Sequence, residues 1–224
     1  MARVLCAAFA RRADRRRGAW NVSAITGINT VIYYAPKIYQ AAGFESNNAA
    51  ILATAGVGLV NVLMTIVSLA LIDRLGRRPL LIIGNIGMGL SLAALSLSIL
   101  FKVSGDLLRW IGVGSTLIYV AFFAISLGPV FWIMIAEIYP LRIRGFAMSF
   151  ATALSWMSNL IVSFSFPVLL ESAGAGATFA VYTLITIASL VFAIRVVPET
   201  KGLSLEQIER QERTGALHRA KSRY

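Results

Sequence analysis

The chain alternates between long apolar runs and short polar segments. Six of the apolar runs approach or exceed the roughly 20 residues that a helix needs to cross the hydrocarbon core of a bilayer. They cover residues 19–39, 49–72, 80–101, 110–136, 146–170 and 177–194. Their interiors hold no Asp, Glu, Arg or His, and Lys37 lies close to the end of the first run. The pattern predicts an all-α membrane protein with six transmembrane helices.

Basic residues gather on one side of the predicted membrane. Eighteen of the 21 Lys and Arg residues lie in the terminal segments, in alternate loops or just after the last run, and the other three are Lys37, Lys102 and Arg109. The positive-inside rule then places both termini in the cytoplasm, and we expect the plasma (inner) membrane. We divide the chain into a basic cytoplasmic segment (1–18), a six-helix domain (19–197) and a cytoplasmic tail (198–224). Within the tail, residues 204–207 either open a polar helix with a capping box or belong to a solvated segment.

Two of the predicted helices contain glycine together with proline. The first holds Gly27 and Pro36, and the fourth holds Gly128 and Pro129. If the six helices form two inverted repeats of three helices, these two are the first helices of their repeats and correspond to each other. Interrupted helices at matching positions point to a transporter's binding site, because opened backbone is tolerated at membrane depth only where it lines a cavity. We therefore expect a binding cavity beside these breaks.

Polar and aromatic side chains lie near the predicted breaks in the first and fourth helices, and the second and fifth helices add others within their spans. Asn29 and Tyr33 are four residues apart, and Trp156 and Asn159 are three apart, so each pair shares a helix face. The candidate substrate ligands are Asn29, Tyr33, Tyr34, Asn61, Trp132, Trp156 and Asn159. Simpler interpretations exist, because an intramembrane Asn often only bonds a neighbouring helix and a Trp near the interface often only anchors its helix.

The chemistry of this set favours a neutral, polyhydroxylated solute. Amides offer donors and acceptors together, and an indole offers an apolar face to a sugar ring. A cation carrier is expected to bury Asp or Glu, and an anion carrier Arg or Lys. The predicted spans contain none of these mid-helix. A sugar or polyol is therefore the expected substrate.

The composition excludes several other classes of protein. Hydrophobic residues make up 58% of the chain, charged residues only 14%, and the mean hydropathy is +0.75, beyond ordinary globular usage. One Cys and one His leave no disulfide framework and no metal or haem cluster. The net charge of +11 belongs to loops and tails rather than to a folded basic stripe. We expect no cofactor, no nucleic-acid partner and no enzymatic activity.

Five short motifs follow one another in the chain at the ends or breaks of the predicted helices. They are Gly27-Ile-Asn-Thr-Val-Ile-Tyr-Tyr-Ala-Pro36, Asp73-Arg-Leu-Gly-Arg-Arg78, Gly128-Pro-Val-Phe-Trp132, Glu137 with Arg144, and Pro198-Glu-Thr-Lys-Gly202. In this order they resemble the sugar porter family of the major facilitator superfamily. The resemblance runs from about Thr26 to Glu209 and corresponds to the C-terminal six-helix half of the family's twelve-helix fold.

The resemblance implies transport by alternating access, with the sugar held between two six-helix halves. It implies that the candidate ligands contact or close over the substrate. It also implies a cytoplasmic salt-bridge network that holds the outward-facing state, formed by Asp73, Arg77, Arg78, Glu137, Arg144 and Glu199. The expected partners are a monosaccharide or polyol, membrane lipid and the missing N-terminal half. Proton coupling stays open, because the family's usual proton carboxylate lies in that other half.

The chain departs from the family pattern in two places. Direct alignment puts Ser23 and Ala24 where the family has a Gln-Gln pair that usually binds sugar, and a basic stretch at 11–17 replaces the start of the first helix. With the first six helices missing, we expect a fragment, a misplaced start or a frameshifted gene model rather than a true half-size protein that pairs with another half. The alternative to a carrier half is a non-transporting membrane module, such as a sensor or a partner made from a carrier fragment.

Overall fold

The computed structural model describes residues 28–41, 47–103, 105–138, 144–197, 199 and 201, and every element within them is helical. The predicted segment 1–18 and Gly27 lie outside the described residues, as does the tail apart from Glu199 and Lys201. The helices are α2 (Ile28–Ala41), α3 (Asn47–Leu75), α4 (Arg77–Leu100), α5 (Asp106–Ile125), α6 (Leu127–Ile138) and α7 (Arg144–Arg195).

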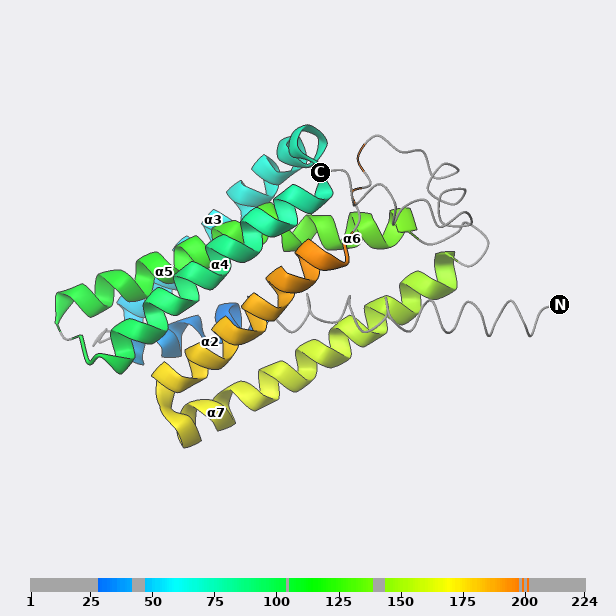
Figure 1. The fold of residues 1–224 in the computed structure, drawn as a ribbon. Coiled ribbons are helices and arrows are strands. Elements are labelled where there is room, and N and C mark those ends of the chain that lie inside the picture. The colour runs from blue at the N-terminus through cyan, green and yellow to red at the C-terminus, as the bar shows by residue number, and fades with distance from the viewer. Residues whose placement is uncertain are drawn as a thin grey trace.

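The helices follow the predicted apolar runs in order. Among the described residues, four continuous helical stretches are long and apolar enough to cross a membrane: Ile51–Leu75, Arg77–Leu100, Asp106–Ala136 and Arg144–Arg195. The third joins α5 to α6. The fourth, α7, is 52 residues long and consists of two helices that meet at Gly174, where φ is 79°. Figure 1 shows these two arms of α7 as a V that folds back on itself. The arms before and after Gly174 match the fifth and sixth predicted runs.

The first predicted helix is represented by α2, which has 14 described residues. We predict a break at Pro36, but α2 runs through this residue from Ile28 to Ala41. In the fourth run the helix is interrupted at Ser126, two residues before the predicted Gly128-Pro129 break.

α4 lies at the centre of the packing, between α5 and the second arm of α7 (Figure 1). The approach to α5 is close because α4 presents glycine there. A Cβ on Gly84 would lie 1.7 Å from Ser126 Oγ, and one on Gly87 would lie 2.3 Å from the Phe122 ring. Small residues at helix interfaces allow such close backbone approach in membranes.

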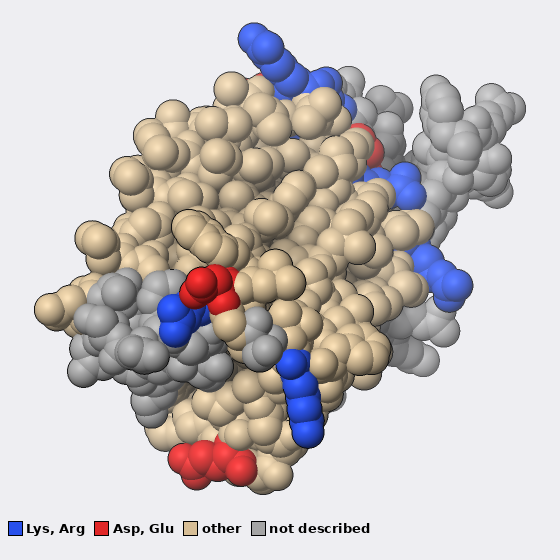
Figure 2. All heavy atoms as spheres, turned by 90° about the vertical axis from the view of Figure 1, so that its left-hand side faces the viewer, with Lys and Arg blue, Asp and Glu red and all other residues tan. Residues whose placement is uncertain are grey.

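Large apolar side chains cover much of the outside of the bundle. On α3, Leu52 is 75% exposed and Ile66 is 61% exposed. Figure 2 views the end that carries the α4–α5 turn and the kink of α7, and charged side chains there are few among uncharged ones. An apolar exterior of this kind is stable against lipid rather than water, because lipid tails are as apolar as the side chains they meet.

Candidate substrate-binding site

A polar bridge connects α2 to the first arm of α7. Ser163 Oγ donates a hydrogen bond to Asn159 Oδ1 at 3.1 Å. Its oxygen also lies 3.5 Å from Thr30 Oγ1, and the Tyr34 hydroxyl donates to the Ser163 carbonyl oxygen at 3.4 Å. Because the single Ser163 proton is directed at Asn159, Thr30 is the donor in the contact with Ser163. The bridge therefore brings two of the predicted ligands, Tyr34 and Asn159, to one place.

This bridge fixes the orientation of the Asn159 side chain. Helical spacing puts Asn159 and Ser163 one above the other on α7, and the Ser163 hydroxyl donates to the amide oxygen of Asn159. This hydrogen bond assigns which end of the Asn159 amide is oxygen and which is nitrogen. The amide N–H₂ group then points away from Ser163. It is the part of Asn159 that remains for a ligand.

Three aromatic candidates are exposed. Tyr33 and Trp156 are each 60% exposed, and Trp132 is 44% exposed. The Trp132 ring meets the edge of Phe131, with 5.2 Å between the ring centroids. By contrast, Tyr34 is half-buried and stacks on Phe166 with 5.1 Å between centroids. The exposed aromatic rings therefore lie on an open surface of the described helices.

Two other candidate ligands, Asn29 and Asn61, are both half-buried. In the middle of α3, Thr65 Oγ1 donates to the Asn61 carbonyl oxygen at 2.8 Å, and Asn61 Oδ1 lies 3.4 Å from the same hydroxyl. The Asn61 side chain thus lies close to Thr65 of its own helix. Asn29 lies in the first turn of α2, one residue before Thr30 of the polar bridge.

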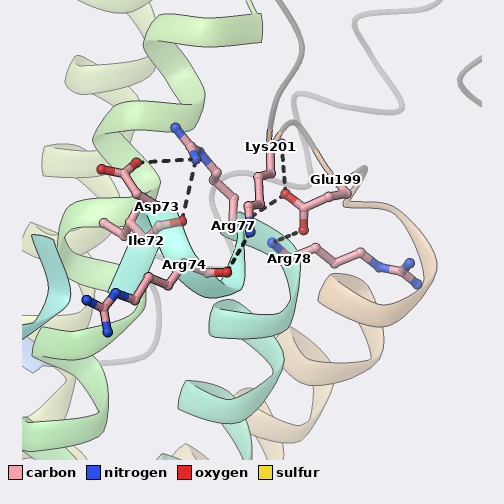
Figure 3. A network of polar contacts seen from close by, with 7 residues as sticks. All are labelled: Ile72, Asp73, Arg74, Arg77, Arg78, Glu199 and Lys201. Atoms are coloured by element: carbon pink, nitrogen blue, oxygen red, sulfur yellow. Dashed lines mark hydrogen bonds and ion pairs between the residues drawn. The ribbon is translucent and has the colours of Figure 1, made fainter. Parts of the chain in front are cut away.

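At the opposite end of α7, Glu199 connects the end of that helix to the start of α4 (Figure 3). Its carboxylate accepts from the backbone N–H groups of Arg77 (3.0 Å) and Arg78 (3.1 Å), and from that of Lys201 (2.9 Å). The first N–H groups of a helix have no partner inside the helix, and an anion there also meets the positive end of the helix dipole. Glu199 thus caps α4 across 122 residues of sequence.

The basic side chains of this cluster contact backbone carbonyls as well as a carboxylate. Figure 3 shows the Arg78 guanidinium pointing away from Glu199, and it donates to the Ile194 carbonyl at 2.9 Å. Arg77 pairs with Asp73 at 3.8 Å, and Lys201 Nζ donates to the Arg74 carbonyl at 2.5 Å. The described contacts between Glu199 and Arg77 or Arg78 are made by the Glu199 carboxylate with the backbone N–H groups of the two arginines.

Arg144, the first residue of α7, donates a hydrogen bond to the Ala136 carbonyl oxygen near the end of α6. The side chain of its predicted partner Glu137 lies outside the described residues. The role of these two residues in a gate therefore stays a prediction. The contact that is described connects α7 to α6 through a helix-terminal carbonyl, which a cation stabilises.

Sequence reasoning did not single out Thr30 or Ser163. Both are among many hydroxyl residues in the apolar runs, most of which bond to a carbonyl of their own helix, as Thr116 and Thr186 do. Ser163 lies four residues after Asn159. That spacing was the available signal, since residues four apart meet on a helix.

Comparison with known proteins shows which family the chain belongs to. Residues 19–211 match the sequence model of the family described as "Sugar (and other) transporter". The chain belongs to this family. It is 44% identical over 187 residues to the putative metabolite transport protein YwtG of Bacillus subtilis, with 84% of this chain and 41% of that protein covered. It is 42% identical to the D-xylose transporter of Levilactobacillus brevis, with 83% and 40% covered.

Solved structures agree on the fold. This sugar-transporter chain matches a double-tryptophan mutant of XylE with a TM-score of 0.78 and 35% identity, covering 86% of the chain and 41% of XylE. It also matches the major facilitator proton:xylose symporter XylE bound to 6-bromo-6-deoxy-D-glucose, with a TM-score of 0.75. The predicted fold, a six-helix half of a major facilitator, is confirmed. The relatives are transporters, which also confirms that the chain is not an enzyme.

The chain spans about 40% of the length of the relatives it matches. Their names refer to D-xylose, to myo-inositol in the B. subtilis transporter IolT, and to facilitated glucose diffusion in a Zymomonas mobilis protein. These solutes are named for the relatives, each of which is longer than this chain.

Proposed function

We propose that this chain is the C-terminal half of a carrier that moves a neutral sugar or polyol across the plasma (inner) membrane by alternating access, with both of its termini in the cytoplasm. The observation that carries the proposal is the polar bridge among Thr30, Tyr34, Asn159 and Ser163. It holds uncharged donors and acceptors between two helices made largely of apolar residues. The sugar- and polyol-named relatives support the same class of substrate.

In this proposal the substrate meets Asn159 and the ring of Trp156. The Asn159 amide N–H₂ donates to a sugar hydroxyl, because its oxygen is already bonded to Ser163. Trp156 lies three residues earlier on the same face and is 60% exposed, so it offers a flat apolar surface to the sugar ring. Asn29, Tyr33, Tyr34, Asn61 and Trp132 complete the proposed set.

The proposed cavity needs walls beyond this chain. Tyr33, Trp132 and Trp156 are all exposed in the described helices, whereas a ligand pocket buries most of its ligand. We therefore propose that a second six-helix half covers these side chains. Asp73, Arg77, Arg78, Glu137, Arg144 and Glu199 would then form the cytoplasmic gate of the complete carrier.

Proton coupling would depend on a carboxylate outside the described spans. The acidic residues within these helices lie in a terminal turn or near the kink of α7, at Asp73, Asp106, Glu137 and Glu171. None is near the polar bridge in sequence. Some of the relatives are described as D-xylose-proton symporters and one as a facilitated diffusion protein, so both modes occur within the family.

The test is uptake into proteoliposomes. The chain is reconstituted alone, and together with the first six-helix half of the L. brevis D-xylose transporter. We expect saturable uptake of D-xylose, D-glucose or myo-inositol only with both halves, and no uptake of gluconate or glucosamine, which carry charge. Stereoselective uptake by the chain alone would overturn the half-carrier proposal. Failure of the pair to bind or move any neutral sugar would instead favour the non-transporting module.

A further inference from the structure

Pro129 removes one backbone hydrogen bond at the break between α5 and α6. In a continuous α-helix the N–H of residue 129 donates to the carbonyl of Ile125, but Pro129 has no N–H. The chain turns at Ser126, where φ is −117° and ψ is −88°. Water is absent from the hydrocarbon core, so a carbonyl freed at this depth needs another donor.

Ser68 of α3 supplies that donor. Its hydroxyl donates to the Ile125 carbonyl oxygen at 2.9 Å, and the side chain is fully buried, with 0% exposed. The contact joins residues 57 positions apart. Most hydroxyls in these helices turn back to a carbonyl of their own helix, as Thr116 does with Gly112. Ser68 instead crosses to the carbonyl that proline leaves without its helical partner.

Hydrogen bonds and close packing also hold Ser126, the residue at which the helix is interrupted. Ser126 donates its own hydroxyl to the Phe122 carbonyl at 2.6 Å, while its backbone N–H bonds to the Phe123 carbonyl at 3.1 Å. Gly84 of α4 leaves the space that this hydroxyl fills. The break is therefore enclosed by α3 and α4, which limits the directions in which α6 can leave α5.

We propose that Ser68 is a positioning residue whose hydroxyl replaces the missing N–H of Pro129 and so fixes the direction of α6 relative to α5. α6 begins one residue after the Ser126 turn and carries Trp132. Loss of the hydroxyl leaves a buried carbonyl unpaired and lets the break open more often. The effect on a bound sugar through Trp132 rests on the proposed function, but the coupling between Ser68 and Pro129 does not.

The test is a double-mutant cycle read by amide hydrogen exchange on the purified chain in lipid nanodiscs. Ser68→Ala should speed exchange of the backbone amides of residues 127, 128, 130 and 131 about tenfold, the size expected for one buried unpaired carbonyl. Pro129→Ala restores the helical N–H to Ile125. In that background Ser68→Ala should change exchange by less than about twofold. An equal effect in both backgrounds would overturn the proposal.

Ser96 gives the matched control. Its hydroxyl donates across helices to the Gly176 carbonyl at 2.8 Å and is also buried, but it does not involve a proline. Ser96→Ala should leave residues 127–131 unchanged and act alike with Pro129 or Ala at position 129. If Pro129→Ala does not fold, Ser68→Thr and Ser68→Val decide the matter. They have the same shape, and only Thr keeps the hydroxyl. Equal exchange at the break in these two variants would refute the role of the hydroxyl.

Sugar binding is read separately. A carrier that binds no sugar, yet shows the exchange coupling between positions 68 and 129, would contradict the proposed function and leave the positioning role intact. A carrier that binds sugar without this coupling would contradict the positioning role alone.

Discussion

Ser163 connects α2 to the first arm of α7 and orients the side chain of Asn159. Its hydroxyl donates to Asn159 and contacts Thr30, and its backbone carbonyl accepts from Tyr34. Each partner is uncharged, so the bridge is stable in an apolar surrounding without the desolvation cost of an ion pair. The residue therefore matters through the orientation it gives to Asn159.

We predict that Ser163→Ala weakens sugar binding by the assembled carrier by about 1 kcal/mol, the usual net value of one hydrogen bond. The Asn159 amide loses its orientation and spends part of its time with the wrong group toward the ligand. The dissociation constant is measured by tryptophan fluorescence titration, with Trp156 nearby on the same face. Ser172→Ala is the control, because Ser172 bonds to the Val168 carbonyl on the exposed part of α7. Equal constants for wild type and Ser163→Ala would refute the orienting role.

Gly84 is predicted to tolerate no side chain. A Cβ there would lie 1.7 Å from Ser126 Oγ, so Gly84→Ala must push α4 from α5 or displace the hydroxyl that bonds Phe122. We expect a loss of roughly 1–3 kcal/mol, the range for an overpacked core. Thermal unfolding in detergent measures it. Gly58→Ala on α3, where no atom lies within 4 Å of the added Cβ, is the control. Equal stability of the two variants would mean that the α4–α5 contact is looser than described.

At the scale of elements, the apolar periodicity of the sequence was enough to find the helices. Six runs of suitable length predict six crossings, and the described helices follow these runs. The prediction works because a helix that crosses the bilayer must be both long and apolar, and both properties can be read from the sequence. Glycine and proline were a partial guide. Pro129 lies beside a real interruption, whereas α2 continues through Pro36. At Pro129 the carbonyl of Ile125 accepts from Ser68 of α3, and nothing in the sequence distinguishes Ser68 from the many other serines.

The charged motifs were predictable as residues, but the capping of α4 was not. The sequence predicts Glu199 on the same side of the membrane as Arg77 and Arg78, which suggests a salt-bridge network. The structure adds that the carboxylate accepts from their backbone N–H groups. Gly76 makes this contact possible: its φ is +92°, and a Cβ there would lie 2.8 Å from Glu199 Oε2. A glycine thus lets the carboxylate reach the helix end.

We predict that Glu199→Ala destabilises the folded chain by about 1 kcal/mol through the loss of a helix cap. Glu199→Gln should fall between wild type and Ala, because it keeps one acceptor and loses the charge that favours the helix N-terminus. Thermal unfolding of the three forms measures the order. Glu171→Ala, on an exposed residue of α7, serves as the control. If Gln and Ala were both as stable as wild type, the cap would contribute nothing.

At the scale of the whole molecule, charge asymmetry sets the orientation. Eighteen basic residues on one predicted side and three on the other predict cytoplasmic termini. The cluster of Asp73, Arg77 and Glu199 would then face the cytoplasm, and the turn between α4 and α5 would face outward.

Cysteine labelling in intact cells tests this orientation. In a Cys6→Ser background, cysteines at Ser46 and Ser104 should react with an impermeant maleimide from outside, and a cysteine at Ser204 should react only after the cells are opened. Labelling of position 204 in intact cells would reverse the assignment. A cysteine at Leu59, in the middle of α3, controls for residues shielded by lipid.

The cap on α4 has a consequence for biosynthesis. A ribosome makes Arg77 and Arg78 long before Glu199, 122 residues later, so the start of α4 enters the membrane with its first amides still paired to water. The carboxylate arrives only when the last helix has been inserted. A nascent chain released before residue 199 would carry its helices without this cap. In the predicted orientation, proteases in the cytoplasm would then distinguish it from the finished protein by the uncapped turn at Asp73–Arg78.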